Sequence, residues 1–289
     1  MKTLQRRIQD AAKHARVGQI VVERDYAQGY VLVGLGRHPA LREALVFKGG
    51  TALKKVHLGG HYRFSEDLDF SAVAGPTGLD LERAVRVAVE DGRAAARQFA
   101  DVDMTVERYE ERVPHPGGQE AFVVRVQFPW QRRPFVAIKI EITHDEPVLL
   151  PSPPLAVTHG YDEVLDASVR AYHLDEIAAE KLRATRQTQA KLLARGWVRP
   201  RARDYYDLWH LVRLPQERLD WGRVTTILPR KCAHRQVRID SVADVFDAAL
   251  LAEVRASWAR TVGPFVAELP DVERVLEETR VRLDSLLRL

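Results

Sequence analysis

The chain has 289 residues, of which 46% are hydrophobic, and a formal net charge of +4 at pH 7. A chain of this size and composition can bury a substantial core, in one extended domain or two ordinary ones, which excludes a largely disordered protein. It has no apolar run near the roughly eighteen residues of a membrane span, no apolar signal-peptide centre at its start and only one cysteine, Cys232, so we expect a cytoplasmic protein without internal disulfides or a thiolate zinc site.

A glycine turn follows the first predicted elements. Hydrophobic spacing predicts helices at 3–16 and about 19–36 and a short strand at 44–48. The turn Lys48-Gly49-Gly50-Thr51 comes next and is expected to lead into a helix at 51–57. The backbone N–H groups of Gly50 and Thr51 would then lie at a helix amino terminus, which favours anions. Taken alone, a Gly-Gly pair is more often a simple turn than a phosphate site.

Two aspartates mark the next predicted strand, residues 63–71. Side chains alternate in an extended segment, so Asp67 and Asp69 share one face, about 6.6 Å apart along the strand. Adjacent carboxylates repel each other unless a cation lies between them, and Mg²⁺ is an oxygen-seeking ion that suits this role. A metal site beside a phosphate-sized turn suggests nucleotide chemistry.

A third carboxylate comes from a later strand. Hydrophobic patterns predict a helix at 79–99 and strands at 102–109, 121–128 and 135–143. Alternation in the last strand places Lys139 and Glu141 together on its polar face. If this strand lies beside the acidic strand, Glu141 completes a triad with Asp67 and Asp69, the kind of ligand set that two Mg²⁺ ions use in nucleotidyl transfer. The alternative is that Glu141 is an ordinary exposed strand residue.

A proline-rich stretch, 147–168, is the predicted domain boundary. We therefore expect an α+β protein with a mixed α/β domain at 1–168 and an all-helical domain at 169–289. The helices of the second domain are predicted at 173–193, 201–213, 240–260 and 271–288.

Charged residues occupy unusual positions in the predicted helical domain. Lys181 falls on an apolar helical stripe, so its ammonium needs an anionic partner, a triphosphate or a site carboxylate, unless it snorkels to the rim of the core. Asp204 and Asp207 are neighbours on one helical face. They are expected to orient an attacking hydroxyl, or to pair with Lys181 and Arg203, or to form simple surface ion pairs.

The segment from Lys181 to Arg238 is strongly basic. It contains 15 Lys and Arg residues against 4 acidic residues, a local charge of about +11 of the kind that a polyanion meets. Aromatic residues on which unpaired bases stack are interleaved with these charges: Trp197, Tyr205, Tyr206, Trp209 and Trp221. Solvated helix faces are the alternative explanation.

Taken together, these motifs resemble the AbiE-type (AbiEii/MenT-like) nucleotidyltransferase toxin family of type IV toxin–antitoxin and abortive-infection systems. The matching pieces run in the family's order over roughly residues 20–212. They are the elements Glu23–Tyr26, Phe47–Leu53, Arg63–Phe70, Lys139–Ile142, Ile177–Ala184 and Arg203–Leu208. Of these, the Lys-Gly-Gly-Thr and Arg-Phe-Ser-Glu-Asp-Leu-Asp elements are the most specific, and nothing recognisable covers 215–289.

The resemblance implies a polymerase-β-like nucleotidyltransferase core with a mixed sheet, followed by a helical domain that contributes catalytic residues and a basic RNA-binding surface. It implies five catalytic residues, Asp67, Asp69, Lys181, Asp204 and Asp207. It also implies that Asp67 and Asp69 are Mg²⁺ ligands, to which strand alternation adds Glu141, and that Gly50 and Thr51 hold the triphosphate. The full set of expected nucleotide-binding residues is Lys48, Gly49, Gly50, Thr51, Arg63 and Ser65.

The expected reaction is Mg²⁺-dependent transfer of a nucleoside monophosphate from an NTP to RNA, at the 3′ acceptor end of tRNA, which blocks translation. The family also implies a cognate antitoxin partner. Nucleotidylation of a protein or small-molecule hydroxyl is an alternative, although a basic segment suits cationic antibiotics poorly. A non-catalytic protein that binds RNA or an antitoxin is a second alternative, and it leaves the acidic triad unexplained.

Overall fold

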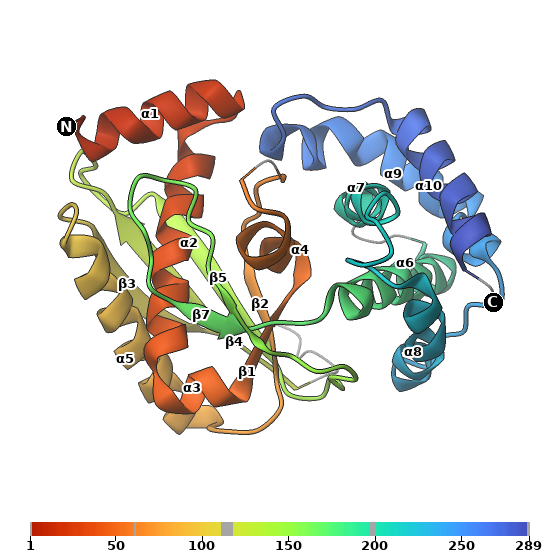
Figure 1. Ribbon diagram of the computed structural model, residues 1–289, viewed down its shortest axis with the longest axis horizontal. Coiled ribbons are helices and arrows are strands. Elements are labelled where there is room, and N and C mark those ends of the chain that lie inside the picture. The colour runs from red at the N-terminus through yellow and green to blue at the C-terminus, as the bar shows by residue number, and fades with distance from the viewer. Residues whose placement is uncertain (1, 61, 111–117, 197–199, 288–289) are drawn as a thin grey trace. The chain divides into compact units, whose positions relative to one another are not determined.

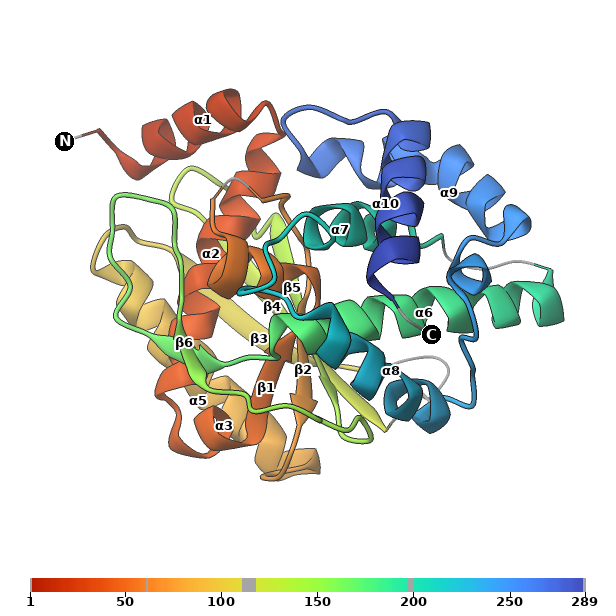
Figure 2. The same ribbon diagram turned by 45° about the vertical axis from the view of Figure 1, so that its right-hand side comes forward.

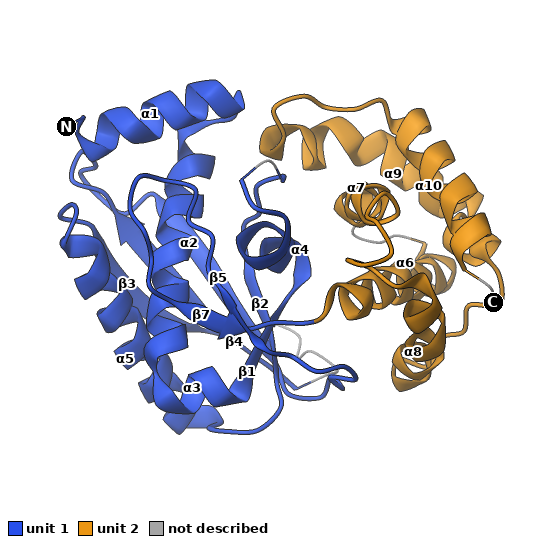
Figure 3. Cartoon of the chain, in the orientation of Figure 1, with its two compact units in different colours: residues 1–172 blue, residues 173–289 orange. Residues whose placement is uncertain are grey.

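The computed structural model describes residues 2–60, 62–110, 118–196 and 200–287. The chain divides into two compact units, residues 1–172 and 173–289 (Figure 3). The division falls four residues after the predicted boundary at 168/169, in the segment that leaves the last strand. Within the described residues, no helix combines the length and the apolar character needed to cross a membrane.

The first unit is built on a five-stranded mixed sheet in the order β1-β2-β5-β4-β3 (Figure 1). Strands β2 and β5 run parallel, and the other neighbours are antiparallel. The sheet strands are β1 (Leu45–Lys48), β2 (Leu68–Ala72), β3 (Asp103–Tyr109), β4 (Gln119–Gln127) and β5 (Val136–Thr143). The helices are α1 (Leu4–Ala15), α2 (Gln19–Arg37), α3 (Pro39–Ala44), α4 (Gly49–Ala52) with its π-helical continuation η1 (Leu53–Leu58), and α5 (Gly78–Arg97).

Two glycines allow α2 and α5 to pack closely. A Cβ atom at Gly34 would lie 1.8 Å from the Ala88 carbonyl oxygen, and one at Gly92 would lie 2.4 Å from the Tyr30 carbonyl oxygen. Both helices contact the sheet, and the inward side chains of β5 such as Ile140 are fully buried. The apolar face of the sheet is therefore covered, and the alternate side chains of β2 and β5 are left to form a polar face.

The predicted strand at 63–71 is wrong in its first half, because β2 begins only at Leu68. Before Leu68, the backbone carbonyls accept hydrogen bonds from side chains and not from a neighbouring strand. Gln28 Nε2 donates to the Ser65 carbonyl at 3.2 Å and to the Glu66 carbonyl at 3.0 Å, and Thr51 Oγ1 donates to the Asp67 carbonyl. Asp67 thus lies in the loop that enters the strand.

A short hairpin was also missed within the proline-rich stretch. Strand β6 (Pro154–Ala156; Figure 2) pairs antiparallel with β7 (Ser168–Arg170; Figure 1), and β7 contacts β1. A bridge between Phe47 and Ala171 continues this contact. Three-residue strands with a proline carry too little periodicity to be recognised in a sequence.

The second unit is helical throughout its described residues. It contains α6 (Leu174–Arg195), α7 (Ala202–Leu211), α8 (Trp221–His234), η2 (Val242–Val245), α9 (Ala248–Thr261), η3 (Gly263–Phe265) and α10 (Val272–Leu286). The α+β class, a mixed-sheet core followed by a helical part, is confirmed. The single helix predicted at 240–260 is wrong, because Asp247 caps a new helix by accepting from Ala249 N and Leu250 N.

Helix α8 was not predicted. Pro229 lies inside it and reads as a helix breaker. The helix forms nevertheless because Asp220 caps its start and because Trp221, Val224 and Leu228 are buried along one face. Tertiary packing overrides the local signal here.

His159 is buried without a hydrogen-bond partner on either ring nitrogen among the described residues. It lies against the rings of Tyr26, Tyr30 and Tyr161, at centroid distances of 5.0, 5.2 and 4.9 Å. Burial, together with the Lys55 ammonium, lowers the pKa of His159 to about 3. The native state therefore keeps this imidazole neutral where the unfolded chain binds a proton.

This group makes stability pH-dependent in a defined window. The stabilisation that comes from a neutral His159 is present above about pH 6.5 and is lost progressively as pH falls from 6.5 towards 3. We therefore expect the free energy of unfolding to be about 2 kcal/mol lower at pH 5. Urea unfolding of His159→Phe at pH 7.5 and pH 5 should show a smaller difference between the two pH values than the parent protein shows. The exposed His14→Phe is the control and should keep the parent's difference; an unchanged difference in His159→Phe would contradict the assignment.

Candidate functional site

Three polar side chains lie in register on the adjacent strands β1, β2 and β5 of the first unit. Lys48 of β1 pairs with Asp69 of β2, and Asp69 pairs with Glu141 of β5. Residues directly opposite one another in a sheet point to the same face. The acidic strand therefore lies beside the strand that carries Glu141, as expected. Asp67 lies just before the start of β2.

The electrostatics of this row favour a bound cation. Burial and the negative charges of Glu141 and Asp67 raise the pKa of Asp69 to about 8, while Lys48 opposes the shift. A divalent ion held by Asp67 and Asp69 would remove this repulsion, so the donor set fits the oxygen ligands that Mg²⁺ prefers.

Glu141 is engaged by a cation of the protein itself. Its carboxylate pairs with Lys139, whose Nζ also lies 4.6 Å from the centre of the Tyr109 ring. Within the described residues, no three His, Cys, Asp or Glu side chains are already arranged to hold a metal ion. Any contribution of Glu141 to a metal site therefore competes with the Lys139 ion pair.

The glycine turn packs directly against this row. Gly49 has φ +79°, and a Cβ atom there would lie 2.5 Å from Asp69 Oδ2. At Gly50 a Cβ atom would lie 2.3 Å from Nη2 of the buried Arg63. Only glycines therefore let the turn approach the acidic residue and the guanidinium this closely.

The helix after the turn begins two residues earlier than predicted, at Gly49, and continues as the π-helical η1. The Lys48 side chain does not cap its start. Thr51 is buried, and its hydroxyl donates to the Asp67 carbonyl. The structure thus gives Thr51 a role in fixing the backbone that carries Asp67.

Sequence reasoning missed the residues that support the turn. Lys55 Nζ lies 3.0 Å from Asp25 Oδ1 and donates to the Asp25 carbonyl at 2.8 Å, so a buried ion pair ties η1 to α2. Gln28 of the same helix bonds the backbone at Ser65, which is itself buried. The available signal was the run of polar residues within α2, where Asp25 and Gln28 interrupt an otherwise apolar helix.

In the second unit, Lys181 bridges the two predicted aspartates. Its Nζ lies 2.9 Å from Asp204 Oδ1 and 2.5 Å from Asp207 Oδ2, and Asp207 is fully buried. Although burial acts to raise it, Lys181 and Arg201 lower the pKa of Asp204. Arg203 instead donates to the Thr261 carbonyl and lies over the Phe265 ring. The anionic partner expected for Lys181 is thus a pair of site carboxylates.

The basic segment is partly internal. Lys231 is fully buried and pairs with Glu176 at 2.7 Å, and Arg183 pairs with Glu180. The stacking role expected for the aromatic residues is not supported for Tyr205, Tyr206 or Trp221, since all three are buried. Trp209 is half-buried with Arg213 stacked on it, and Trp197 lies outside the described residues.

Comparisons with known proteins show which family the chain matches. The model of the family described as "Nucleotidyl transferase AbiEii toxin, Type IV TA system" matches residues 31–278. None of the curated proteins matches the chain. Among solved structures, the chain is similar to MenT4, a nucleotidyltransferase toxin from Mycobacterium tuberculosis H37Rv, with 24% identity and a TM-score of 0.63 over 98% of this chain and 90% of that chain.

Proposed function

The chain belongs to the AbiEii family of nucleotidyltransferase toxins of type IV toxin–antitoxin systems, and from this premise we propose that it transfers a nucleoside monophosphate from an NTP to the 3′ end of tRNA, which blocks translation. The observation that carries the proposal is the row of Lys48, Asp69 and Glu141 beside the glycine turn. A nucleotidyltransferase needs carboxylates for metal next to backbone and cations for a triphosphate, and this row supplies both.

In the proposed mechanism Asp67 and Asp69 would hold Mg²⁺, and Glu141 would join them as a third ligand on leaving its ion pair with Lys139. The ion, when bound, would lower the pKa of the attacking hydroxyl and neutralise charge on the α-phosphate. Lys48, Arg63 and the backbone of Gly49, Gly50 and Thr51 bind the triphosphate oxygens, with Ser65 at the border of this set. The glycine turn keeps the nucleotide close to Asp69.

Lys181, Asp204 and Asp207 form the second proposed catalytic group. Two carboxylates within 3 Å of one ammonium hold that ammonium in a fixed orientation. We propose that Lys181 binds phosphate oxygens of the NTP and that Asp204, the more exposed of the two aspartates, orients the attacking hydroxyl.

An RNA acceptor is supported by the positive charge at the end of α6. Burial and the nearby Arg201, Arg195, Arg183 and Arg235 lower the pKa of the exposed Lys191. Cations concentrated in this way suit a phosphate backbone. The proposed setting is the cytoplasm, where NTPs and tRNA occur together, with a cognate antitoxin as the regulating partner.

The crowding at Gly49 gives a direct test of the turn. We expect Gly49→Ala to reduce nucleotidyl transfer at least about tenfold, because the new methyl group displaces Asp69. Gly59→Ala is the matched control, since Gly59 also has a positive φ, +76°, but a Cβ atom there would meet nothing within 4 Å. Both variants place a Cβ atom at a positive φ, a strain of about 1–3 kcal/mol, so equal transfer rates in the two would remove the glycine turn from the proposed site.

The acceptor can be identified by supplying each of the four α-labelled NTPs to separate RNA and protein fractions. Label in the tRNA band supports the proposal. Label confined to protein would instead support protein nucleotidylation, and RNA binding without any label would support a non-catalytic protein.

A further inference from the structure

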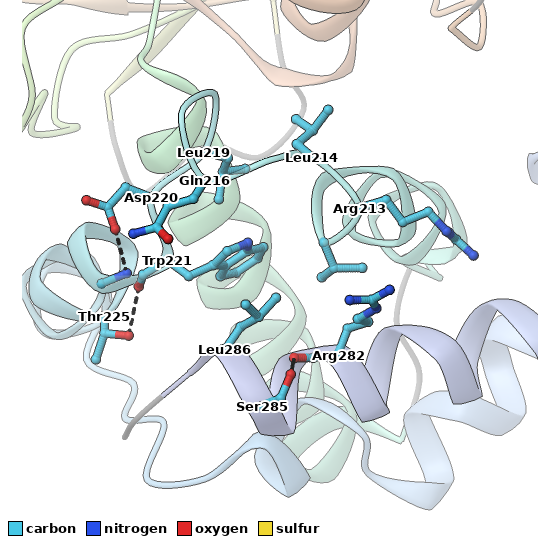
Figure 4. Close-up of a pocket in the computed structure, with 12 residues that line it drawn as sticks. Arg213, Leu214, Gln216, Leu219, Asp220, Trp221, Thr225, Arg282, Ser285 and Leu286 are labelled. Carbon is cyan, nitrogen blue, oxygen red and sulfur yellow. Dashed lines mark hydrogen bonds between the residues drawn. The ribbon is translucent and has the colours of Figure 1, made fainter.

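The helical unit contains a pocket of about 800 Å³ that none of the proposed catalytic or nucleotide-binding residues lines (Figure 4). Its volume lies in the range of small-molecule sites. It is formed by the end of α7, the following loop, the start of α8 and the last turns of α10. Its apolar wall includes Leu214, Leu219 and Leu286 together with the Trp221 indole.

Most hydrogen-bonding groups in this pocket are already used within the protein. The Asp220 carboxylate caps α8 by accepting from Gly222 N at 2.9 Å, and the Thr225 and Ser285 hydroxyls donate to the Trp221 and Arg282 carbonyls. Figure 4 shows these bonds along the pocket wall. They offer a ligand little further capacity.

Two donors remain. Trp221 is 5% exposed, and its Nε1 has no hydrogen-bond partner among the described residues, which is a costly arrangement for a buried N–H group. The exposed Arg282 lines the pocket from α10, and no described acid pairs with its guanidinium. Figure 4 shows the indole and the Arg282 side chain directed towards the same hollow from opposite sides.

The rim adds positive charge. Arg213 and Arg282 also line a smaller recess of about 440 Å³, together with Arg274, Glu277 and Glu278. Glu278 pairs with both Arg213 and Arg274. The three arginines line this one recess, and burial together with the charges of Arg274 and Arg282 lowers the pKa of Arg213. An anionic group at this rim would relieve their repulsion.

We propose that this pocket binds an amphipathic organic anion, with its apolar body against the leucines and the Trp221 indole and its acidic group on Arg282. The unpartnered Trp221 N–H favours a ligand with an acceptor. The Arg282 guanidinium favours a negative charge, and Leu214, Leu219 and Leu286 favour an apolar body. The site is separate from the nucleotidyltransferase site and does not depend on the proposed RNA substrate.

The test uses the fluorescent anion 8-anilinonaphthalene-1-sulfonate as the probe on the full chain. We expect saturable binding that is about tenfold weaker in Arg282→Gln, since a charge-assisted contact is lost. Arg280→Gln removes an exposed charge from the same helix, outside the pocket lining, and should leave the affinity unchanged. Trp221→Phe, which keeps a ring but removes the donor, should also bind more weakly.

The uncharged analogue N-phenyl-1-naphthylamine separates charge from apolar character. It should bind at least tenfold more weakly than the sulfonate. Equal affinities of the sulfonate for Arg282→Gln and Arg280→Gln, or tighter binding of the neutral analogue, would overturn the proposal. Circular dichroism of each variant checks that it is folded. If Trp221→Phe does not fold, the comparison of Arg282→Gln with Arg280→Gln still tests the proposal.

Discussion

Asp69→Asn should reduce nucleotidyl transfer by at least about a thousandfold while leaving the protein as stable as the parent or more stable. The activity falls because an amide is a poor ligand for Mg²⁺ and carries no charge. The stability does not fall because Asp69 is repelled by Glu141 and Asp67, and because burial disfavours its charge. Functional residues often show this opposition between activity and stability.

The measurement pairs the transfer rate from α-labelled NTP with urea unfolding of the metal-free protein. Asp67→Asn should lose activity in the same way. Asp145→Asn, in the loop after β5, is an exposed control that should keep full activity. Loss of stability in Asp69→Asn together with retained transfer would show that this carboxylate holds the fold and does not serve the reaction.

Lys181→Met should destabilise the protein by about 3–5 kcal/mol, because it removes the ammonium that neutralises the buried Asp207 and the adjacent Asp204. Urea unfolding measures this loss. Lys191→Met, which removes an exposed lysine from the same helix, is the control and should change stability by less than about 0.5 kcal/mol.

A double variant separates stability from catalysis. Lys181→Met with Asp207→Leu replaces the buried ion pair by apolar groups and should recover much of the lost stability. If Lys181 binds the NTP, as proposed, the double variant stays inactive although it is folded. Recovery of transfer together with recovery of stability would assign Lys181 a purely structural role.

The environment of Lys181 was predicted in part from the sequence. Its place on an apolar stripe indicates a buried ammonium with an anionic partner, since an unpaired buried charge is too costly. The sequence leaves two partners open, a triphosphate and a carboxylate. Asp204 and Asp207 are among the candidates from the sequence, and the packing of α6 on α7 selects them, because contacts between helices depend on loop geometry that periodicity does not encode.

In the sheet, too, some features were predictable from the sequence and others were not. Alternation in β5 predicts that Lys139 and Glu141 share a face, and pairing two apolar faces brings this face to the same side as Asp69. The pairing of β2 with β5 and the register that sets Glu141 opposite Asp69 come from the structure. The start of β2 was not predictable in this way, because Gln28 and Thr51 bond the backbone before Leu68 from distant positions. The buried aromatic residues of the basic segment were misjudged because charge in a sequence does not show which neighbours face the core.

The transfer of label from α-labelled NTP to total RNA tests the central claim most directly. The parent protein with Mg²⁺ should label the tRNA band, in a product that 3′-end analysis places at the acceptor end, and Asp67→Ala should label nothing. An equally labelled tRNA band with Asp67→Ala, or no labelled RNA from the folded parent with any of the four NTPs, would contradict it.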